Sequence, residues 1–243
     1  MTAAQHDGFQ AASWVLDEVT WVALGGLQAG LAKADADGRR YDPEVAPFAA
    51  VRHHDVAAVA GMVGRLAGAD SLAFSTLAPL GDVDGAVTVV RAKLLQMVLS
   101  DAQALVGPSG FDVVRLSAGD VPQMLDLAQA ARPGPFGSRT IEMGTYLGIR
   151  VDGALAAMAG ERQRVPGFTE ISAVCVAPEY RGRGYAGALV IRLARDILNR
   201  GDTPFLHVVT ENVNAIALYR KLGFTTRREL HLLILKRSLP ALD

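Results

Sequence analysis

The sequence predicts an α/β fold built on a mixed sheet. In the second half of the chain, strand-like segments alternate with segments of helical spacing. Their order is strand, helix, three strands, helix, strand, helix, strand. Half of the 243 residues are hydrophobic, which is enough to fill a sizeable core. The turn-rich stretch at residues 106–110 lies between two patterned segments, so we expect two domains, over residues 1–108 and 109–243.

The first half is predicted to be a smaller α/β domain. Residues 11–33 are apolar with helix-like spacing that Gly25 and Gly26 interrupt, and residues 55–66 repeat apolar side chains along one helical face. Residues 47–51 have the length and composition of a short strand. Residues 71–77 and 87–99 are strand or helix candidates, which hydrophobic periodicity does not separate.

The second half has clearer element signals. Strands are expected at residues 111–116, 146–151, 154–161, 169–176, 205–209 and 230–236, and helices at residues 121–131, 184–200 and 213–222. Asp120 introduces the first of these helices, and Gly223 ends the last. Asp152-Gly153 lies between two strand segments and predicts a tight hairpin. This order predicts a mixed sheet with helices on both faces.

Composition excludes several classes of protein. The chain has 24 Lys and Arg against 25 Asp and Glu, so its net charge of -1 gives no general attraction to nucleic acid. No uncharged stretch is long enough to span a bilayer, and Cys175 is the single cysteine. We therefore expect a cytoplasmic protein, monomeric or homodimeric, without a membrane segment. Residues 111–243 carry an excess of basic side chains, which indicates an anionic small ligand there or an interface with the acidic first half.

Adjacent histidines, His53 and His54, are the obvious candidates for a metal site. Neighbouring side chains on a strand point to opposite faces, and no third ligand follows at helical spacing. We therefore expect solvated histidines and no metal.

The loop at residues 177–184 carries the clearest chemical signal. A strand ends at Val176, the loop brings Arg181, Gly182 and Arg183, and a helix begins after Gly184. Glycines let the backbone approach a ligand closely, and the unpaired amides of a helix start attract anions. Two arginines add positive charge. The loop therefore predicts a phosphate cradle.

Residues 182–187 also match G-x-G-x-x-G, the dinucleotide-binding fingerprint. In the dinucleotide fold, however, the first glycine follows its strand almost directly, whereas five residues intervene here. The acid expected at the end of the next strand is missing, and too little chain follows for a complete nucleotide-binding sheet. We discount a dinucleotide site.

A second pattern is Arg181-x-x-Gly184-x-Ala186, which follows Val176-Ala-Pro178. It resembles the acyl-CoA-binding signature of the GNAT superfamily of N-acyltransferases. The resemblance continues at Asn212, at Asn214-Ala-Ile-Ala-Leu-Tyr219 and at Leu222-Gly-Phe224, and covers roughly residues 111 to 237. The chain looks like a bacterial, uncharacterised branch of the superfamily. In such proteins the N-terminal half often resembles a degenerate second copy of the fold, so a tandem arrangement of two GNAT-like folds is one alternative for this chain.

This resemblance implies a set of cofactor contacts. The backbone of Val174 to Val176 would pair with the pantetheine arm beside a splayed sheet, and the Val176 N–H would face the thioester oxygen. The implied acyl-CoA-binding residues are Val174, Cys175, Val176, Arg181, Gly182, Arg183, Gly184, Tyr185, Ala186, Gly187 and Asn212. The structural alternative is an ordinary buried strand followed by a tight turn.

The catalytic residues are also implied by the family. Tyr219 occupies the general-acid position, and the alternative is a tyrosine packed in the core. His207 and Glu170 are two candidates for the base, and His207 would equally suit a satisfied core position. Alternation predicts that Glu170 shares a strand face with Val174 and Val176. Glu142 could instead bind the amine, and Cys175 is expected to be a buried structural thiol rather than a nucleophile.

The expected function is N-acetyl transfer from acetyl-CoA to a primary amine by direct attack on the thioester. The alternative is a non-catalytic acyl-CoA-binding module, and a purely structural scaffold is the third reading. The acidic first half would cover the acceptor cleft and suit a cationic amine. No motif identifies the acceptor.

Overall fold

The computed structural model describes residues 13–52, 55–67, 70–108 and 110–238. Within these ranges the chain forms an eight-stranded mixed sheet and a separate three-stranded sheet. The adjacent histidines, His53 and His54, lie outside the described residues.

The eight-stranded sheet has the strand order β4-β11-β5-β10-β9-β8-β7-β6. Its strands are β4 (Ser71–Thr76), β5 (Ala86–Leu99), β6 (Val113–Arg115), β7 (Tyr146–Val151), β8 (Ala154–Val165), β9 (Phe168–Val176), β10 (Thr203–Val209) and β11 (Phe224–Arg237). The small sheet consists of β1 (Ala32–Ala34), β2 (Gly38–Tyr41) and β3 (Ala49–Val51). The helices are α2 (Val19–Gly25), α3 (Val56–Gly64), α4 (Val121–Ala131), α5 (Tyr185–Asn199) and α6 (Val213–Lys221).

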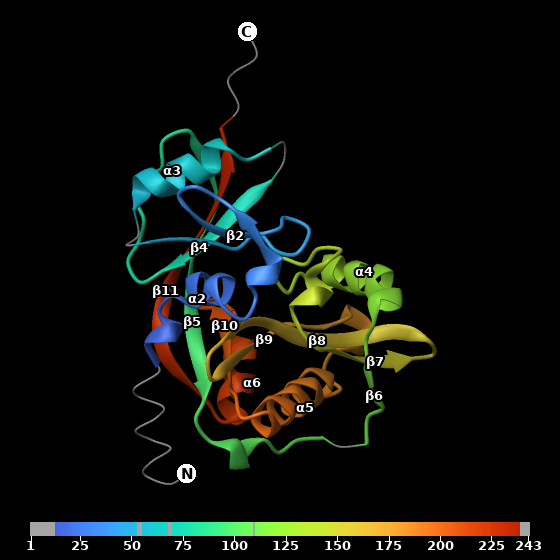
Figure 1. Cartoon of the computed structure of the whole chain (residues 1–243). Coiled ribbons are helices and arrows are strands. Elements are labelled where there is room, and N and C mark those ends of the chain that lie inside the picture. The colour runs from blue at the N-terminus through green and yellow to red at the C-terminus, as the bar shows by residue number, and fades with distance from the viewer. Residues whose placement is uncertain (1–12, 53–54, 68–69, 109, 239–243) are drawn as a thin grey trace.

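From β6 to β11 the order of strands and helices is the one that the sequence predicts. The expected hairpin joins β7 to β8, and both of its turn residues have positive φ, 49° at Asp152 and 82° at Gly153. This is the conformation that a two-residue primed turn requires, and Asp-Gly adopts it readily. Figure 1 shows α4 on one face of β7, β8 and β9 and α5 on the other, and α6 lies beside α5 and contacts β11.

Two hydrophobic cores lie on the two faces of these strands. Leu189, Leu193 and Ile197 of α5 pack with Ile171 of β9 on one face. Met124 and Leu127 of α4 pack on the other face with Cys175. Both cores are well buried, so burial of apolar side chains holds the two helix layers against the sheet.

Strands β9 and β10 are paired at only one end. Their parallel pairing joins Phe168 to Thr203 and ends at Glu170 with Phe205. Strand β9 nevertheless continues to Val176, and β10 continues to Val209. The sheet therefore splays open between the second parts of these strands, as the resemblance implied.

A bulge in β9 overturns one detail predicted from strand alternation. The register with β8 shifts between Met158 and Gly160, and Ala173 has a φ of 51°, which is rare for a residue with a side chain. The extra residue reverses the side-chain alternation. Ile171 therefore packs on the α5 face with Val174, whereas Ala173 packs on the α4 face. Glu170 thus does not share a face with Val174 and Val176.

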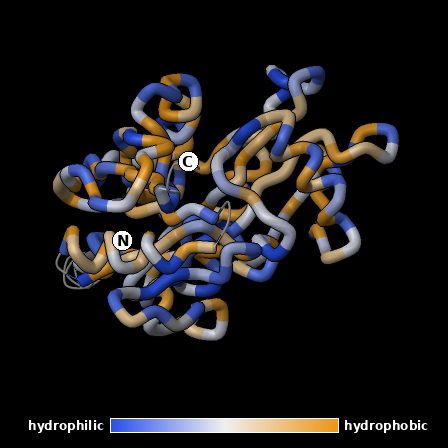
Figure 2. Tube along the Cα trace, turned by 90° about the horizontal axis from the view of Figure 1, so that it is seen from above, coloured by the Kyte–Doolittle hydropathy of each residue, from blue (hydrophilic) through white to orange (hydrophobic). Residues whose placement is uncertain are grey.

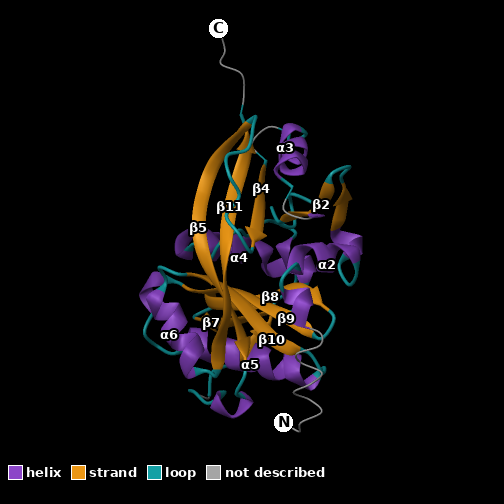
Figure 3. Cartoon of the chain, turned by 90° about the vertical axis from the view of Figure 1, so that its left-hand side faces the viewer, coloured by secondary structure: helices purple, strands orange, loops and turns teal. Residues whose placement is uncertain are grey.

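The two halves of the sequence share one sheet. Strand β5 lies between β10 and β11, with Phe205 opposite Val98 and Phe224 opposite Leu99. Strand β4 pairs with the outer edge of β11. Strand pairing therefore crosses the boundary expected between residues 1–108 and 109–243. Figure 3 shows β5 and β11 running from the upper part of the molecule into the lower part.

The last strand is longer than expected, because β11 begins at Phe224 rather than near residue 230. Its first part contains Arg227, Arg228 and Glu229, whose charges hide the strand pattern. A register shift between Thr226 and Arg228 also breaks the alternation there.

Figure 2 shows hydrophobic and hydrophilic residues intermixed along the coloured part of the chain. Among the described residues, none of the helices is long and apolar enough to cross a membrane.

Candidate active site

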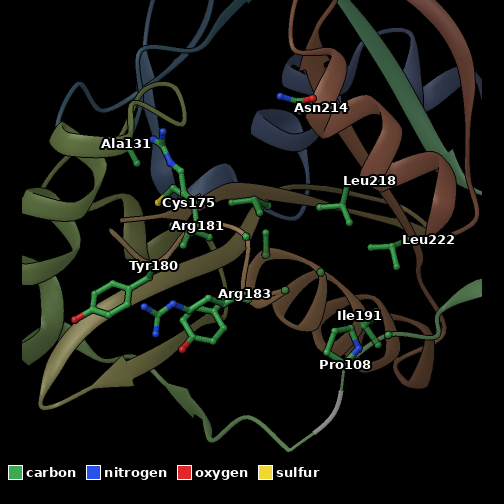
Figure 4. A pocket seen from close by; sticks show the side chains of 18 of the residues that line it. Pro108, Ala131, Cys175, Tyr180, Arg181, Arg183, Ile191, Asn214, Leu218 and Leu222 are labelled. Atoms are coloured by element: carbon green, nitrogen blue, oxygen red, sulfur yellow. The ribbon is translucent and has the colours of Figure 1, made fainter. Parts of the chain in front are cut away.

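A pocket of about 610 Å³ lies where β9, the loop after it, α5 and α6 meet. The structure brings together in its lining every residue predicted to bind acyl-CoA. These are Val174, Cys175, Val176, Arg181, Gly182, Arg183, Gly184, Tyr185, Ala186, Gly187 and Asn212. Figure 4 shows Tyr180, Arg181 and Arg183 on one side of the pocket, and Leu218 of α6 and Leu222 just after it on the other. We call this the cofactor pocket.

The start of α5 is built from backbone rather than side chains. Gly182 and Gly184 both have positive φ, 78° and 84°, and Gly184 is the N-cap. The first intrahelical bond runs from the Ala188 N–H to the Gly184 carbonyl, so the preceding amides of the first turn have no partner within the helix. Such amides attract anions, and the positive end of the 15-residue helix adds to the attraction.

Segment 106–108 closes one side of the cofactor pocket. Pro108 lies so near the cradle that a Cβ on Gly184 would come within 2.9 Å of its ring. Val106 and Gly107 also line the pocket. The sequence indicated only a turn here, because nothing local says which loop the segment will contact.

Positive charge surrounds the cofactor pocket. Its lining includes Arg132, Arg181, Arg183 and Lys221, and no Asp or Glu is among the described lining residues. The guanidinium of Arg183 lies 5.2 Å from the ring centre of Tyr180, which orients it along the loop. Arg132 and Lys221 were not predicted from the sequence, since Arg132 directly follows α4 and Lys221 is the last residue of α6. This charge suits a ligand with several phosphates.

The splayed edge of β9 presents backbone amides to the cofactor pocket. The Ala177 N–H donates to the Ala156 carbonyl of β8 at 2.9 Å. Because successive amides of a strand point to opposite edges, the Val176 N–H points away from β8 and into the gap beside β10. A donor is therefore available where the thioester oxygen was expected.

A second cavity of about 460 Å³ lies on the other side of this gap. Val174, Ala186 and Asn212 line both cavities, so the two meet between β9 and β10. Tyr219 and His207 line the second cavity. Its far wall comes from the first half of the sequence, as Phe48, Ala73 and Leu94. We call it the acceptor cavity.

Tyr219 lies on α6 and is 8% exposed. Its ring makes an edge contact with Phe224, with 6.1 Å between the ring centres. Burial raises the pKa of Tyr219 to about 12, so its hydroxyl stays protonated at any physiological pH. Asn212 caps the same helix, because its side chain accepts a hydrogen bond from the Ala215 N–H at 3.2 Å.

Glu170 is fully buried and paired with two neighbours. Arg162 donates to both of its carboxylate oxygens, at 3.0 Å from Nε and at 2.5 Å from the terminal nitrogen. His207 Nδ1 lies 2.8 Å from Glu170 Oε1. Burial raises the pKa of the carboxyl, but the charges and hydrogen bonds of Arg162 and His207 outweigh it and lower the pKa to about 2. A carboxylate of this pKa is a weak base.

Both ring nitrogens of His207 have partners. Gln96 Nε2 lies 3.1 Å from His207 Nε2 and also donates to the Leu16 carbonyl at 2.7 Å. Gln96 Oε1 accepts from Arg227 at 2.9 Å, which fixes the amide orientation. His207 Nε2 is therefore the acceptor, and Nδ1 carries the proton that points to Glu170. The sequence gives no local signal for Gln96, because it lies on β5 in the first half of the chain, far in sequence from His207.

Two further residues have environments that limit their roles. Glu142 forms a two-pronged pair with Arg139 at 2.7 and 2.8 Å and lines neither cavity, so the structure does not bring it to the site. Cys175 is 6% exposed, and burial raises the pKa of its thiol to about 12. A thiol in this state is a poor nucleophile, which agrees with the expected structural role.

The expected acidic cleft wall is not present among the described residues that line the acceptor cavity, because they include no Asp or Glu. Acidic side chains of the first half are paired elsewhere. Asp35 and Asp37 bind Arg65, and Asp17 binds Arg227. Net charge along the sequence does not say which way the side chains point.

Comparisons with known proteins agree with this geometry. The family model described as FR47-like protein matches residues 146–232. A Novosphingobium aromaticivorans protein assigned to the GNAT family of acetyltransferases is similar over 92% of this chain and 99% of that one, with 40% identity and a TM-score of 0.83. The chain belongs to the GNAT family. This bears out the resemblance read from the cradle sequence.

Other GNAT proteins are similar over shorter stretches or at lower identity. The N-alpha-acetyltransferase RimI of Mycobacterium tuberculosis is 40% identical over 84 residues, which cover 32% of this chain and 51% of RimI. This match therefore spans about half the length of that curated relative. A GCN5-related N-acetyltransferase from Kribbella flavida shares the fold over 93% of this chain, with 18% identity and a TM-score of 0.60.

Proposed function

We propose that this GNAT protein is an N-acetyltransferase that moves an acetyl group from acetyl-CoA to a primary amine. The observation that carries the proposal is the splayed edge of β9, where the cofactor pocket with its basic lining meets the acceptor cavity. An acyl donor held in one cavity can there meet an acceptor held in the other.

The residues of the cofactor pocket fit acetyl-CoA. The α5 amides and the nearby Arg181 and Arg183 would hold the phosphates. The free edge of β9 would pair with the pantetheine amides, and Gly184 leaves no side chain between the ligand and Pro108. When bound, acetyl-CoA supplies the activated acetyl group.

The chain then provides two hydrogen-bond donors at the reacting atoms. The Val176 N–H would stabilise negative charge on the thioester oxygen. Tyr219 would donate to the departing sulfur. Because the pKa of Tyr219 is about 12 and that of a thiol ordinarily about 8.5, Tyr219 keeps its proton. The amine nitrogen would add to the thioester carbon, the C–S bond would break as the carbonyl re-forms, and the amine proton that the base removes would end on the sulfur.

His207 remains the candidate base, and Glu170 serves as the residue that positions it. The lone pair of His207 Nε2 points to Gln96, so Gln96 must move before His207 can accept a proton. Glu170 would stabilise the imidazolium that results.

Both candidate bases, His207 and Glu170, are already held by hydrogen bonds to neighbouring side chains. This favours a second candidate function, a module that binds acyl-CoA without turnover. Calorimetric titration with acetyl-CoA and with free CoA tests cofactor binding, which both candidate functions require. Micromolar binding at one site per chain is expected, and absence of binding to either would contradict both. Release of free CoA with an added primary amine then separates the enzyme from the binding module.

We further propose a cytoplasmic location, because the single cysteine is a buried free thiol and suits a reducing compartment.

A further inference from the structure

The acceptor cavity differs from the cofactor pocket in its walls. Its far wall comes from three neighbouring strands and is apolar apart from Ser75, with Ala73 and Ser75 on β4, Leu94 on β5, and Leu232 and Ile234 on β11. Phe48 continues this surface. At about 460 Å³, the acceptor cavity has the size of a typical small-molecule site.

The charged groups of the acceptor cavity are all cations. Arg162 and Arg132 line it, and its described lining holds no carboxylate. The Glu170 carboxylate that neutralises Arg162 is 0% exposed and is not among the described residues that line the cavity. Arg162 also packs over the Phe48 ring at 4.7 Å, which holds its guanidinium at the apolar wall.

If the acceptor carried an ammonium group in addition to its reacting amine, that group would have no carboxylate partner among the described residues that line the cavity. Placing an unpaired charge against apolar side chains and a guanidinium is strongly unfavourable. The reacting amine itself gains from the same surroundings, since apolar walls and a nearby cation favour its neutral, nucleophilic form.

We infer that the acceptor is a primary monoamine on an apolar body, without a second positive charge. This inference rests on the proposed acetyltransferase function. The apolar body would lie against Phe48, Ala73 and Leu232, and the amine would lie at the gap between β9 and β10, near His207 and Tyr219. In the reaction one amine proton leaves with the CoA sulfur, and the product is the neutral amide.

The test compares hexylamine with 1,6-diaminohexane, which has the same chain length and one more charge. Purified full-length protein is first titrated with acetyl-CoA, and then CoA release and the mass of the acetylated product are measured for each amine. We expect kcat/KM to be about a hundredfold higher for hexylamine. Equal or better use of the diamine would overturn the acceptor class and leave the acetyltransferase function standing.

Two other outcomes separate the inference from the function. Binding of acetyl-CoA with no acetylation of hexylamine would overturn the acceptor class while keeping the cofactor pocket. Failure of acetyl-CoA to bind would overturn the proposed function and the inference together.

A matched pair of variants tests whether the acceptor binds in the acceptor cavity. Ser75 of β4 lines the acceptor cavity, so Ser75→Asp would supply the missing carboxylate and raise the use of the diamine relative to hexylamine about tenfold. Ser71 lies on the same strand and outside the described lining, and Ser71→Asp should leave the ratio unchanged. An unchanged ratio in Ser75→Asp, or the same change in both variants, would contradict the placement of the apolar wall.

Discussion

Gln96 and His207 join the two halves of the sequence inside one sheet. They lie opposite each other on β5 and β10, and 3.1 Å separates Gln96 Nε2 from His207 Nε2. The orientation of this candidate catalytic histidine is therefore fixed by a residue from the half that carries no recognisable motif.

Gln96→Ala should lower the free energy of unfolding by about 1–3 kcal/mol, because it removes one hydrogen-bond partner each from the Leu16 carbonyl, His207 Nε2 and Arg227. Urea unfolding measures the change. Gln103→Ala, at an exposed position on the segment after the same strand, serves as the control and should change little. Equal effects in the two variants would mean that the Gln96 contacts contribute nothing.

Glu170→Gln should destabilise the protein at neutral pH by about 3–5 kcal/mol, since Arg162 loses its buried counter-charge. The folded-state pKa of Glu170, about 2, lies below its ordinary value of 4.5. The stability that this difference contributes is therefore fully present above pH 4.5 and is lost as the pH falls toward 2. Chemical unfolding at a series of pH values should show the two proteins converging over that window.

Glu142→Gln is the comparison for this acid dependence. Glu142 is also paired with an arginine, but at the surface, where its side chain is 40% exposed. We expect a change below about 1 kcal/mol. If Glu170→Gln were equally mild, the buried pair would not have the role assigned to it.

Tyr219→Phe should lower kcat about 10- to 100-fold with little change in acetyl-CoA affinity, because only the donor to the departing sulfur is removed. The pKa of Tyr219, about 12, also means that its deprotonation should not limit the rate below about pH 11. Steady-state kinetics over pH, with calorimetry on the variant, measure both effects. A variant with the kcat of the natural protein would rule out the donor role.

Gly184→Ala should weaken acetyl-CoA binding at least tenfold, because the new Cβ would meet Pro108 at 2.9 Å and shift the cradle. Gly201 offers a matched control. It has nearly the same φ, 87° against 84°, but open space around its Cβ position, and it does not line the cofactor pocket.

Both glycine variants should lose about 1 kcal/mol of stability from backbone strain. Only Gly184→Ala should lose affinity in the calorimetric titration. A similar loss of affinity in Gly201→Ala would show that strain alone, and not the fit of the cradle, controls binding.

Local patterns predicted local features of this fold well. Asp152-Gly153 predicted its hairpin, and the glycines and arginines between Val176 and Gly187 lie together along one pocket, at the strand end and helix start that the pattern indicated. These features are short in sequence, and their geometry depends on residues a few positions apart.

Features that depend on distant partners were missed. Residues 87–99 are a helix or strand candidate, and nothing in their pattern indicates pairing with both β10 and β11. The reversal of side chains at Ala173 likewise follows from a bulge against β8, which alternation cannot reveal. Gln96 reaches the site through the pairing of β5 with β10, whereas Arg132 and Lys221 reach it from the ends of α4 and α6.

The position of β5 between β10 and β11 has a consequence for dissecting the chain. A fragment that begins after residue 108 would retain the cradle sequence but lack β4 and β5. The long edges of β10 and β11 would then present unpaired backbone groups, ready to recruit a strand from another copy. Insolubility of such a fragment would therefore reflect a missing sheet neighbour rather than a defective cradle.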